Sequence, residues 1–219
     1  MIESIIYEDN HLLVIEKSSG LLTQPDGSDS DSLEDLCKQY IKEKKQKEGN
    51  VFLHAVHRLD KPVSGIVLFA KTDKALSRLN ESIRNKDCKK IYRALLENSP
   101  PEKEGTLEHF LIHDRFKAQI CSEHAEGAKK CILHYKVLES EKGRTLVEID
   151  LITGRYHQIR AQFSASGCPV AGDLKYGAKH SLPAGEIALK HTALTIRHPV
   201  SREFMTFRSP FAHHLYPSL

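Results

Sequence analysis

The sequence of 219 residues predicts an α+β fold, in which a mixed, mostly antiparallel sheet is flanked by helices. Apolar runs of strand length outnumber segments with helical spacing. Two of these runs, residues 131–139 and 144–151, are joined by the polar turn 140–143, which is typical of antiparallel neighbours. The pattern therefore favours an α+β fold over a doubly wound parallel sheet.

The first predicted elements are a strand over residues 11–17 and a helix that begins after Ser32. Asp35 stands three residues after Ser32, as in a capping box. Apolar side chains then recur at helical spacing. The charged stretch 42–48 is expected to be the solvated end of this helix, and Gly49 is expected to end it.

The next predicted elements begin with residues 65–71, a nearly continuous apolar run that indicates a buried strand. Thr72 can cap a helix that follows this strand. The remaining predicted elements are a strand over 90–96, a loop over 98–102, a helical stretch between Gly154 and Gly167, and strands over 187–196 and 204–207.

Length and composition limit the class of protein. A chain of this size buries about 70% of its unfolded surface, so its core needs neither disulfide nor metal. The five cysteines form no C-x-x-C pair, and no apolar run approaches the length of a membrane span. The first nine residues carry acids where a signal peptide would carry bases, so we expect a cytoplasmic protein.

Charge is distributed unevenly along the chain. Residues 1–50 hold 6 Lys/Arg and 11 Asp/Glu, whereas residues 51–95 hold 10 Lys/Arg and 4 Asp/Glu. The basic surplus of the middle segment indicates a surface that faces a polyanion, although a solvated helix face has the same composition.

A carboxylate stands in a polar loop immediately before a predicted buried strand, in the segment His57–Gly65. Pro62 disfavours helix at the residue before it, which holds the loop open. Arg58 and Lys61 flank Asp60 and favour its ionised form, as a carboxylate nucleophile requires. A loop aspartate that only caps a turn would fit the same residues, so both interpretations stay open here.

A second polar segment, Gly154–Arg160, places two arginines, a histidine and a glutamine at the start of a predicted helix. Arg155 and Arg160 are five residues apart and point to different sides of that helix. One can meet phosphate while the other meets a buried carboxylate, because arginine forms bidentate pairs with both. A solvated helix start explains the same composition.

Four motifs follow one another along the chain. They are His57-Arg58-Leu59-Asp60 with Ser64-Gly65, Tyr92 in a Lys-Ile-Tyr strand, Gly154-Arg155-x-His157-Gln158-Ile159-Arg160, and the glycine-rich segment Gly167-Cys168-Pro169-Val170-Ala171-Gly172-Asp173-x-x-Tyr176-Gly177. In this order they resemble the RluA-type pseudouridine synthase family, over roughly residues 5–210. The chain departs from the family at residues 17–20, where Lys-Ser-Ser-Gly replaces the common Lys-Pro-x-Gly, and at Leu189-Lys190-His191, where Leu-His-Ala is common.

The resemblance assigns roles to individual residues. It implies that Asp60 is the catalytic nucleophile, that Tyr92 lies against the target base and serves in proton removal from its C5, and that Arg160 pairs with the nucleophile. Contacts with RNA are expected from Arg58, Lys61, Lys89, Lys90, Arg155, Tyr156 and His157. Tyr156 stands where the family commonly has Thr, and its ring can stack on RNA.

The family converts uridine in RNA to pseudouridine without cofactor or metal, so the implied partner is structured RNA, ribosomal or transfer. A stacked uracil hides its glycosidic bond and must be extruded into a cleft across the sheet. Attack at C1′ and a route through C2′ both stay open. We expect one catalytic domain over residues 1–219, without an S4-type N-terminal module and acting as a monomer.

Three other classes compete with this interpretation. His54-x-x-His57 and His109-x-x-x-His113 have the spacing of metal ligands, but no third carboxylate accompanies them. An RNA-binding protein without catalysis would not need Asp60, Tyr92 and Arg160 together. A glycosidase would need a second catalytic carboxylate, and none stands in a comparable motif.

Overall fold

The computed structural model describes residues 4–28, 30–46 and 48–211, and its fold is α+β as predicted. Two compact units make up the chain. The first ends at Lys89 and resumes over His191–Ser209, and the second comprises Lys90–Lys190. The chain therefore passes from one unit to the other within β5 (Lys89–Glu97) and again within β10 (Leu189–Arg197).

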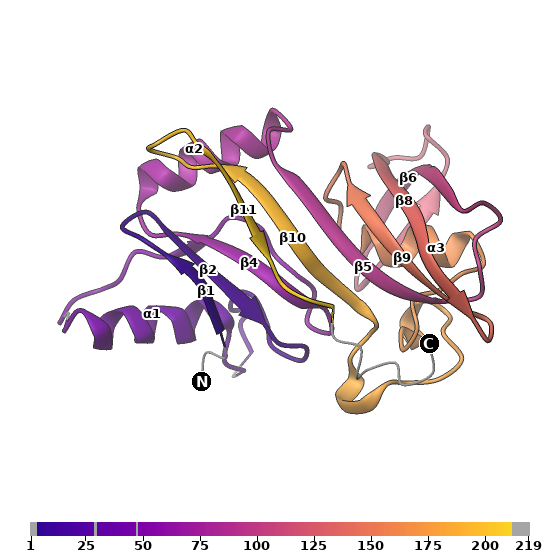
Figure 1. Cartoon of the computed structure of the whole chain (residues 1–219), viewed down its shortest axis with the longest axis horizontal. Helices are drawn as coiled ribbons and strands as arrows, with labels where there is room; N and C mark the ends of the chain where they lie inside the picture. The colour runs from indigo at the N-terminus through magenta and orange to yellow at the C-terminus, as the bar shows by residue number, and fades with distance from the viewer. Residues whose placement is uncertain (1–3, 29, 47, 212–219) are drawn as a thin grey trace. The chain divides into compact units, whose positions relative to one another are not determined.

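The first unit contains a sheet in which β1, β2, β4 and β10 follow one another (Figure 1), with β3 paired to β4 and β11 paired to β10. These strands are β1 (Ser4–Glu8), β2 (Leu12–Lys17), β3 (His54–Ala55), β4 (Ser64–Ala70), β10 and β11 (Phe204–Arg208). The pairs β1–β2, β2–β4, β3–β4 and β10–β11 are antiparallel. The strands predicted over 11–17, 65–71, 187–196 and 204–207 are thus confirmed within a few residues.

Both helices of this unit begin where their caps predict. The Ser32 hydroxyl accepts the Asp35 amide at 3.2 Å and donates to the Asp35 carboxylate at 2.6 Å, which starts α1 (Leu33–Lys44). The Thr72 hydroxyl accepts from the Ala75 amide at 3.2 Å and starts α2 (Asp73–Arg84).

The expected end of α1 at Gly49 is wrong, because the helix stops at Lys44. The backbone at Gln46 has a φ of 49°, in the left-handed region, so the helical hydrogen-bond ladder cannot continue through it. Lys47, within the predicted charged end, lies outside the described residues.

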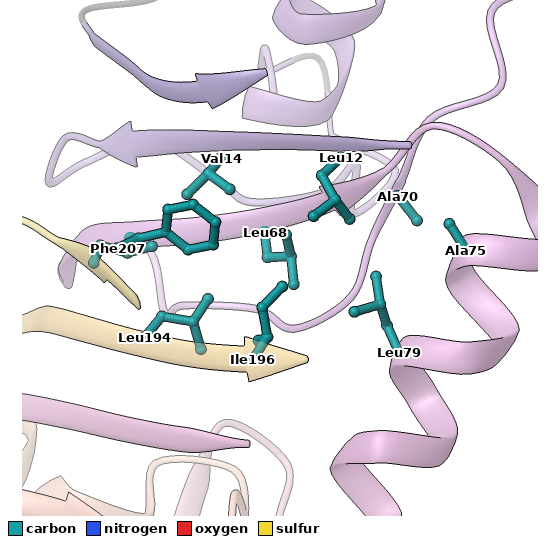
Figure 2. Packing of buried hydrophobic residues seen from close by; sticks show 10 residues of the cluster. Leu12, Val14, Leu68, Ala70, Ala75, Leu79, Leu194, Ile196 and Phe207 are labelled. Carbon is teal, nitrogen blue, oxygen red and sulfur yellow. The ribbon is translucent and has the colours of Figure 1, made fainter. Parts of the chain in front are cut away.

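The core of the first unit lies between its strands and α2, as Figure 2 shows. It is formed by the side chains of Leu12, Val14, Ile66, Leu68, Ala70, Ala75, Leu79, Leu194, Ile196 and Phe207, all at most 6% exposed. Leu12, Val14, Leu68 and Ala70 occupy alternate positions of β2 and β4, the periodicity that sends side chains to one face of a sheet.

The second unit contains an antiparallel sheet in the order β5, β9, β8, β6, β7. Its other strands are β6 (Glu104–Asp114), β7 (Lys117–Cys121), β8 (Lys129–Glu141) and β9 (Arg144–Leu151). The predicted pairing of 131–139 with 144–151 is confirmed, with the turn shortened to Lys142-Gly143. The sequence did not predict β6 and β7.

A short helix, α3 (Gln158–Ala165), contacts β6 and β7, and two 3-10 turns follow, η1 (Leu174–Tyr176) and η2 (Pro183–Gly185). The core beneath α3 joins Leu111, Ala118, Cys131, Ala161 and Tyr176. Cys131, Leu133 and Tyr135 alternate along β8 and are all buried, so Cys131 is a packing residue of this core. Among the described residues, no helix is long and apolar enough to cross a membrane.

Candidate active site

Asp60 lies half-buried in the loop between β3 and β4, in the first unit. Its carbonyl oxygen accepts the Val63 amide at 3.0 Å, which closes the turn into β4. The residue before it is held on both sides: the Thr23 hydroxyl accepts the Leu59 amide at 3.1 Å and donates to the Leu59 carbonyl at 2.9 Å. The backbone that carries the Asp60 carboxylate is therefore fixed by bonds from a distant segment.

The segment after β2 also holds this loop. The Gly20 amide donates to the Lys61 carbonyl at 2.8 Å, and the Ser19 hydroxyl donates to the Pro62 carbonyl at 2.9 Å. Ser19 and Gly20 belong to the Lys-Ser-Ser-Gly turn, in which the chain departs from the pattern of the family that it resembles. The serine hydroxyl thus supplies a specific contact within a turn that lacks the stiffening proline.

Lys17, at the end of β2, has a fully buried side chain beneath the loop. Its ammonium donates to the carbonyls of Ser18, Leu21 and Lys61 at 2.9, 2.6 and 3.2 Å. Burial lowers the pKa of Lys17 to about 8, and the negative charge of Asp60 acts in the opposite direction. The negative charge of Asp60 therefore favours the charged form of the buried Lys17 ammonium.

Gly65 fixes the other end of the loop, at the start of β4. Its φ is +114°, a conformation that side chains rarely adopt. A Cβ there would lie 2.6 Å from the amide nitrogen of His191 on β10, and closer still to its carbonyl oxygen. The His191 ring approaches the same strand, with Nδ1 2.7 Å from the Ile66 carbonyl, and packs edge-on against His57.

Arg160 is buried on α3, in the second unit, and forms a bidentate ion pair with Asp173. Its Nε donates to Oδ2 at 2.6 Å and its Nη2 donates to Oδ1 at 2.9 Å. The guanidinium also lies 4.9 Å from the centroid of the Tyr176 ring. The plane of the arginine is therefore fixed by two different contacts.

His157 precedes α3 in the left-handed conformation, with a φ of 52°, and it is 7% exposed. The Tyr176 hydroxyl accepts the Ala118 amide at 2.8 Å, donates to the Ala118 carbonyl at 3.2 Å and lies 2.9 Å from His157 Nδ1. Because a hydroxyl has one proton, His157 Nδ1 is the donor in the last bond. Burial and the charges of Arg160 and Lys175 lower the pKa of His157 to about 3.

The side-chain amide of Gln158 both accepts and donates hydrogen bonds, which only an amide side chain can do in this arrangement. Its Oε1 accepts from the Thr153 hydroxyl at 2.7 Å and from the Arg155 amide at 3.0 Å. Its Nε2 donates to the Ile132 carbonyl at 3.1 Å and to the Gln162 side chain at 2.9 Å. This residue therefore ties the loop before α3 to strand β8.

Tyr92 lies on β5 opposite Ile149 of β9 and is 6% exposed. Tyr92, Arg160, His157, Tyr156, Arg155 and Lys90 belong to the second unit, and Asp60, Arg58, Lys61 and Lys89 belong to the first. The Lys90 amine approaches Gly154, at 3.2 Å from where a Cβ would stand.

The residues expected to contact RNA differ in exposure. The side chains of Arg58, Lys61, Lys89, Arg155 and Tyr156 are exposed, whereas Lys90 is half-buried. Tyr156 stacks on the His157 ring at 3.8 Å, and the Arg155 Nε donates to the Lys130 carbonyl at 3.1 Å. The role of these residues in RNA binding stays a prediction.

Three residues of the site lay outside the sequence prediction: Lys17, Asp173 and Tyr176. Asp173 and Tyr176 stand in the glycine-rich segment that helped to identify the family, but no role was assigned to them there. The presence of an acidic residue, Asp173, in this segment was the one sequence feature that could have indicated an ion-pair partner for Arg160.

The histidines with ligand-like spacing make other contacts. His57 Nε2 accepts from the Leu68 amide at 3.3 Å, and His109 Nδ1 lies 3.1 Å from the Gln162 amide nitrogen. Within the described part of the chain, no group of three His, Cys, Asp or Glu side chains is placed to hold a metal ion.

Comparison with known proteins shows which protein family this chain matches. The model of the RNA pseudouridylate synthase family matches residues 11–165. The dual-specificity RNA pseudouridine synthase RluA of Haemophilus ducreyi is 36% identical over 214 residues, covering 93% of this chain and 91% of that protein. RluA of Escherichia coli strain K12 is 33% identical over 211 residues, covering 94% of this chain and 92% of that protein.

Solved structures share the fold. Human RNA Pseudouridylate Synthase Domain Containing 4 superposes with a TM-score of 0.80 at 23% identity, covering 96% of this chain and 89% of that one. Human RNA Pseudouridylate Synthase Domain Containing 1 gives a TM-score of 0.73 at 24% identity, with 98% and 86% covered.

Proposed function

Because the chain belongs to the RNA pseudouridylate synthase family and is an RNA-modifying isomerase, we propose that it isomerises specific uridines of ribosomal or transfer RNA with Asp60 as nucleophile. The dual specificity named for the relatives from Haemophilus ducreyi and Escherichia coli supports more than one RNA target. The observation that carries the role of Asp60 is its carboxylate on a backbone-anchored loop above the buried Lys17 ammonium.

The isomerisation of uridine requires an ionised carboxylate at a fixed position. In the reaction the N1–C1′ bond breaks, the uracil turns, a C5–C1′ bond forms, and the C5 proton is lost while N1 gains one. No net oxidation or atom transfer occurs, so the balance needs neither cofactor nor metal. Attack at C1′ and deprotonation at C2′ both use the charged form of Asp60.

Tyr92 is proposed to pack against the base and to relay the C5 proton. A tyrosine suits this role because its ring is apolar while its hydroxyl transfers a proton. The bidentate contact with Asp173 supports Arg160 as a preorganised cation, because it holds the guanidinium in one plane. The prediction that Arg160 pairs with Asp60 joins residues of different units and stays a prediction.

Binding of RNA is proposed to use the exposed cations Arg58, Lys61, Lys89 and Arg155 with the half-buried Lys90, which can contact phosphates, and Tyr156, which can stack. Phosphate contacts offset the few kcal/mol that extrusion of a stacked uridine requires. We also propose that residues 1–219 act as one catalytic domain, as a monomer in the cytoplasm. The five free cysteines support that compartment.

The proposed function is tested by mapping pseudouridines in ribosomal and transfer RNA from cells with and without the gene. Sites that vanish on deletion and return with the wild-type chain identify the targets. The Asp60→Asn variant should restore none of them, yet keep its thermal stability and its affinity for RNA, because a loop carboxylate contributes little to the core.

Two outcomes would overturn this proposal. Full restoration by Asp60→Asn would remove Asp60 from the chemistry. An unfolded variant would give Asp60 a structural role, and Asp60→Glu, which keeps the charge, would then recover the fold.

A further inference from the structure

The turn between β6 and β7 presents an aromatic side chain to solvent. Arg115 and Phe116 form the turn, between Asp114 and its partner Lys117. Phe116 is 76% exposed, the largest value among the large hydrophobic side chains of the described residues. At this exposure the ring of Phe116 is accessible to a partner outside the chain.

The turn is held in place although its side chains are exposed. The Lys175 ammonium donates to the Phe116 carbonyl at 3.2 Å. Below the turn, the Tyr176 hydroxyl binds both the amide and the carbonyl of Ala118, and Ala118 is buried in the core under α3. The ring of Phe116 therefore projects from an anchored hairpin, which reduces the entropy lost on binding.

Three cationic side chains belong to this turn or contact its backbone. Arg115, Lys117 and Lys175 are exposed, and Lys117 Nζ lies 4.9 Å from the centroid of the Tyr176 ring. The acidic residue of the turn, Asp114, has its carboxylate engaged by the Gln119 amide at 3.1 Å. The turn thus combines an exposed aromatic ring with a surplus of cations.

Two further aromatic side chains, those of His113 and Tyr156, lie near this end of the hairpin. His113, which pairs with Ala118 across the strands, packs against Tyr156 at 4.3 Å, and Tyr156 is 39% exposed. A second exposed aromatic side chain, that of Tyr156 in the loop before α3, therefore packs against the same hairpin.

We propose that the hairpin tip, defined as residues 113–117 together with Lys175, is a docking surface for an unpaired nucleotide of the substrate RNA. One base stacks on Phe116, and the flanking phosphates contact Arg115 and Lys117. An aromatic platform beside cations is the arrangement that binds single-stranded RNA. The cations of the tip complement the phosphates of RNA, so the charge favours RNA as the partner.

This inference rests on the proposed function, because it supplies the RNA with a further contact beside those assigned above. Its test uses two probes, a stem–loop RNA with an all-uridine loop and the blunt duplex of the same stem. Affinities for Phe116→Ser, Phe116→Tyr and the wild-type chain are measured by fluorescence anisotropy.

Phe116→Ser should weaken binding of the stem–loop by about tenfold, the effect of losing one stacked base, and should leave duplex binding unchanged. Phe116→Tyr should bind as the wild type does. The matched control is Phe204→Ser, which alters another exposed phenylalanine, 63% exposed on β11, and should bind both probes normally. Replacing Arg115 and Lys117 by Gln should lower the salt slope by about 0.7 per lost phosphate contact.

Unchanged stem–loop affinity in Phe116→Ser would overturn the proposal, as would equal losses for stem–loop and duplex. A wild-type chain that self-associates and is dispersed by Phe116→Ser would assign the surface to a protein partner instead. The Asp60→Asn variant separates the two proposals: it should still show the effect of Phe116→Ser on binding, even if no pseudouridine were formed by any variant.

Discussion

Arg160 and Asp173 form a bidentate ion pair in the interior of the second unit, with side chains only 5% and 1% exposed. Removal of one partner from such a pair leaves an uncompensated buried charge, which destabilises by about 3–5 kcal/mol. The pair joins α3 to the glycine-rich segment before η1, so it determines where the guanidinium of Arg160 stands.

We therefore expect Arg160→Ala and Asp173→Asn each to lower the free energy of unfolding by about 3 kcal/mol and to reduce activity. The double variant Arg160→Met with Asp173→Leu should lose less stability than the two single changes together. Urea unfolding and single-turnover assays measure both quantities. Strictly additive losses of stability, or a fully active Arg160→Ala, would contradict the coupling.

Lys17 should be required for the loop that carries Asp60. Lys17→Met removes three hydrogen bonds to buried or partly buried carbonyls, so we expect a loss of about 3 kcal/mol in unfolding free energy. Activity should fall further than global stability explains, because the loop loses its anchor to the turn after β2. Lys61→Met, an exposed lysine of the same loop, is the matched control and should unfold as the wild type does.

If Lys17→Met were as stable as Lys61→Met, the buried ammonium would not hold the loop. Limited proteolysis gives an independent measurement. Cleavage should appear near residues 58–62 in Lys17→Met before it appears in the wild type, since the Lys61 carbonyl loses its contact with Lys17.

Local chemistry explains which parts of the fold could be predicted from the sequence. The caps Ser32 and Thr72 act within three residues of themselves, and apolar runs such as β4 are buried whatever their neighbours are. Strand β6 escaped prediction because its residues are mostly exposed or half-buried and mix polar with apolar types. The end of α1 was misplaced because the left-handed turn at Gln46 has no glycine to mark it.

The candidate site likewise has residues that the sequence could predict and contacts that it could not. The motifs located Asp60, Tyr92 and Arg160, because those residue types stand in short recognisable segments. Two contacts around these residues were not predicted: Lys17 lies 44 positions before the Lys61 carbonyl that it binds, and Asp173 lies 13 positions after Arg160. Such contacts depend on tertiary packing, which spacing along the chain does not encode.

Gly65 should tolerate no side chain. Gly65→Ala adds a Cβ that meets the backbone of His191 and forces a φ of +114° on an L-residue, so we expect at least about 3 kcal/mol of destabilisation. The matched control is Gly20→Ala, where φ is +84° but no atom lies within 4 Å of the added Cβ. That change should show only the backbone strain, about 1 kcal/mol. Equal effects in thermal unfolding would contradict the steric contact with β10.

His157 should make the protein sensitive to mild acid. Its pKa is about 3 in the folded chain and about 6.5 when unfolded, so below pH 6.5 the unfolded state binds the extra proton. Stability should therefore fall as pH decreases from 6.5, by about 2 kcal/mol at pH 4.5, before most carboxylates titrate. His157→Asn removes the imidazole that takes up this proton, and asparagine tolerates the left-handed φ of 52° at this position.

The comparison between the two proteins isolates His157 from other titrating groups. Burial also lowers the pKa of His109, but that residue is present in both proteins, so its contribution to acid sensitivity is shared. Urea unfolding at pH 7.5, 6.5, 5.5 and 4.5 should give a shallower decline for His157→Asn, by about 1.4 kcal/mol per pH unit in the steepest interval. Parallel declines would mean that the folded chain accepts the proton on His157 as readily as the unfolded chain does, and that burial and the charges of Arg160 and Lys175 do not hold the ring neutral.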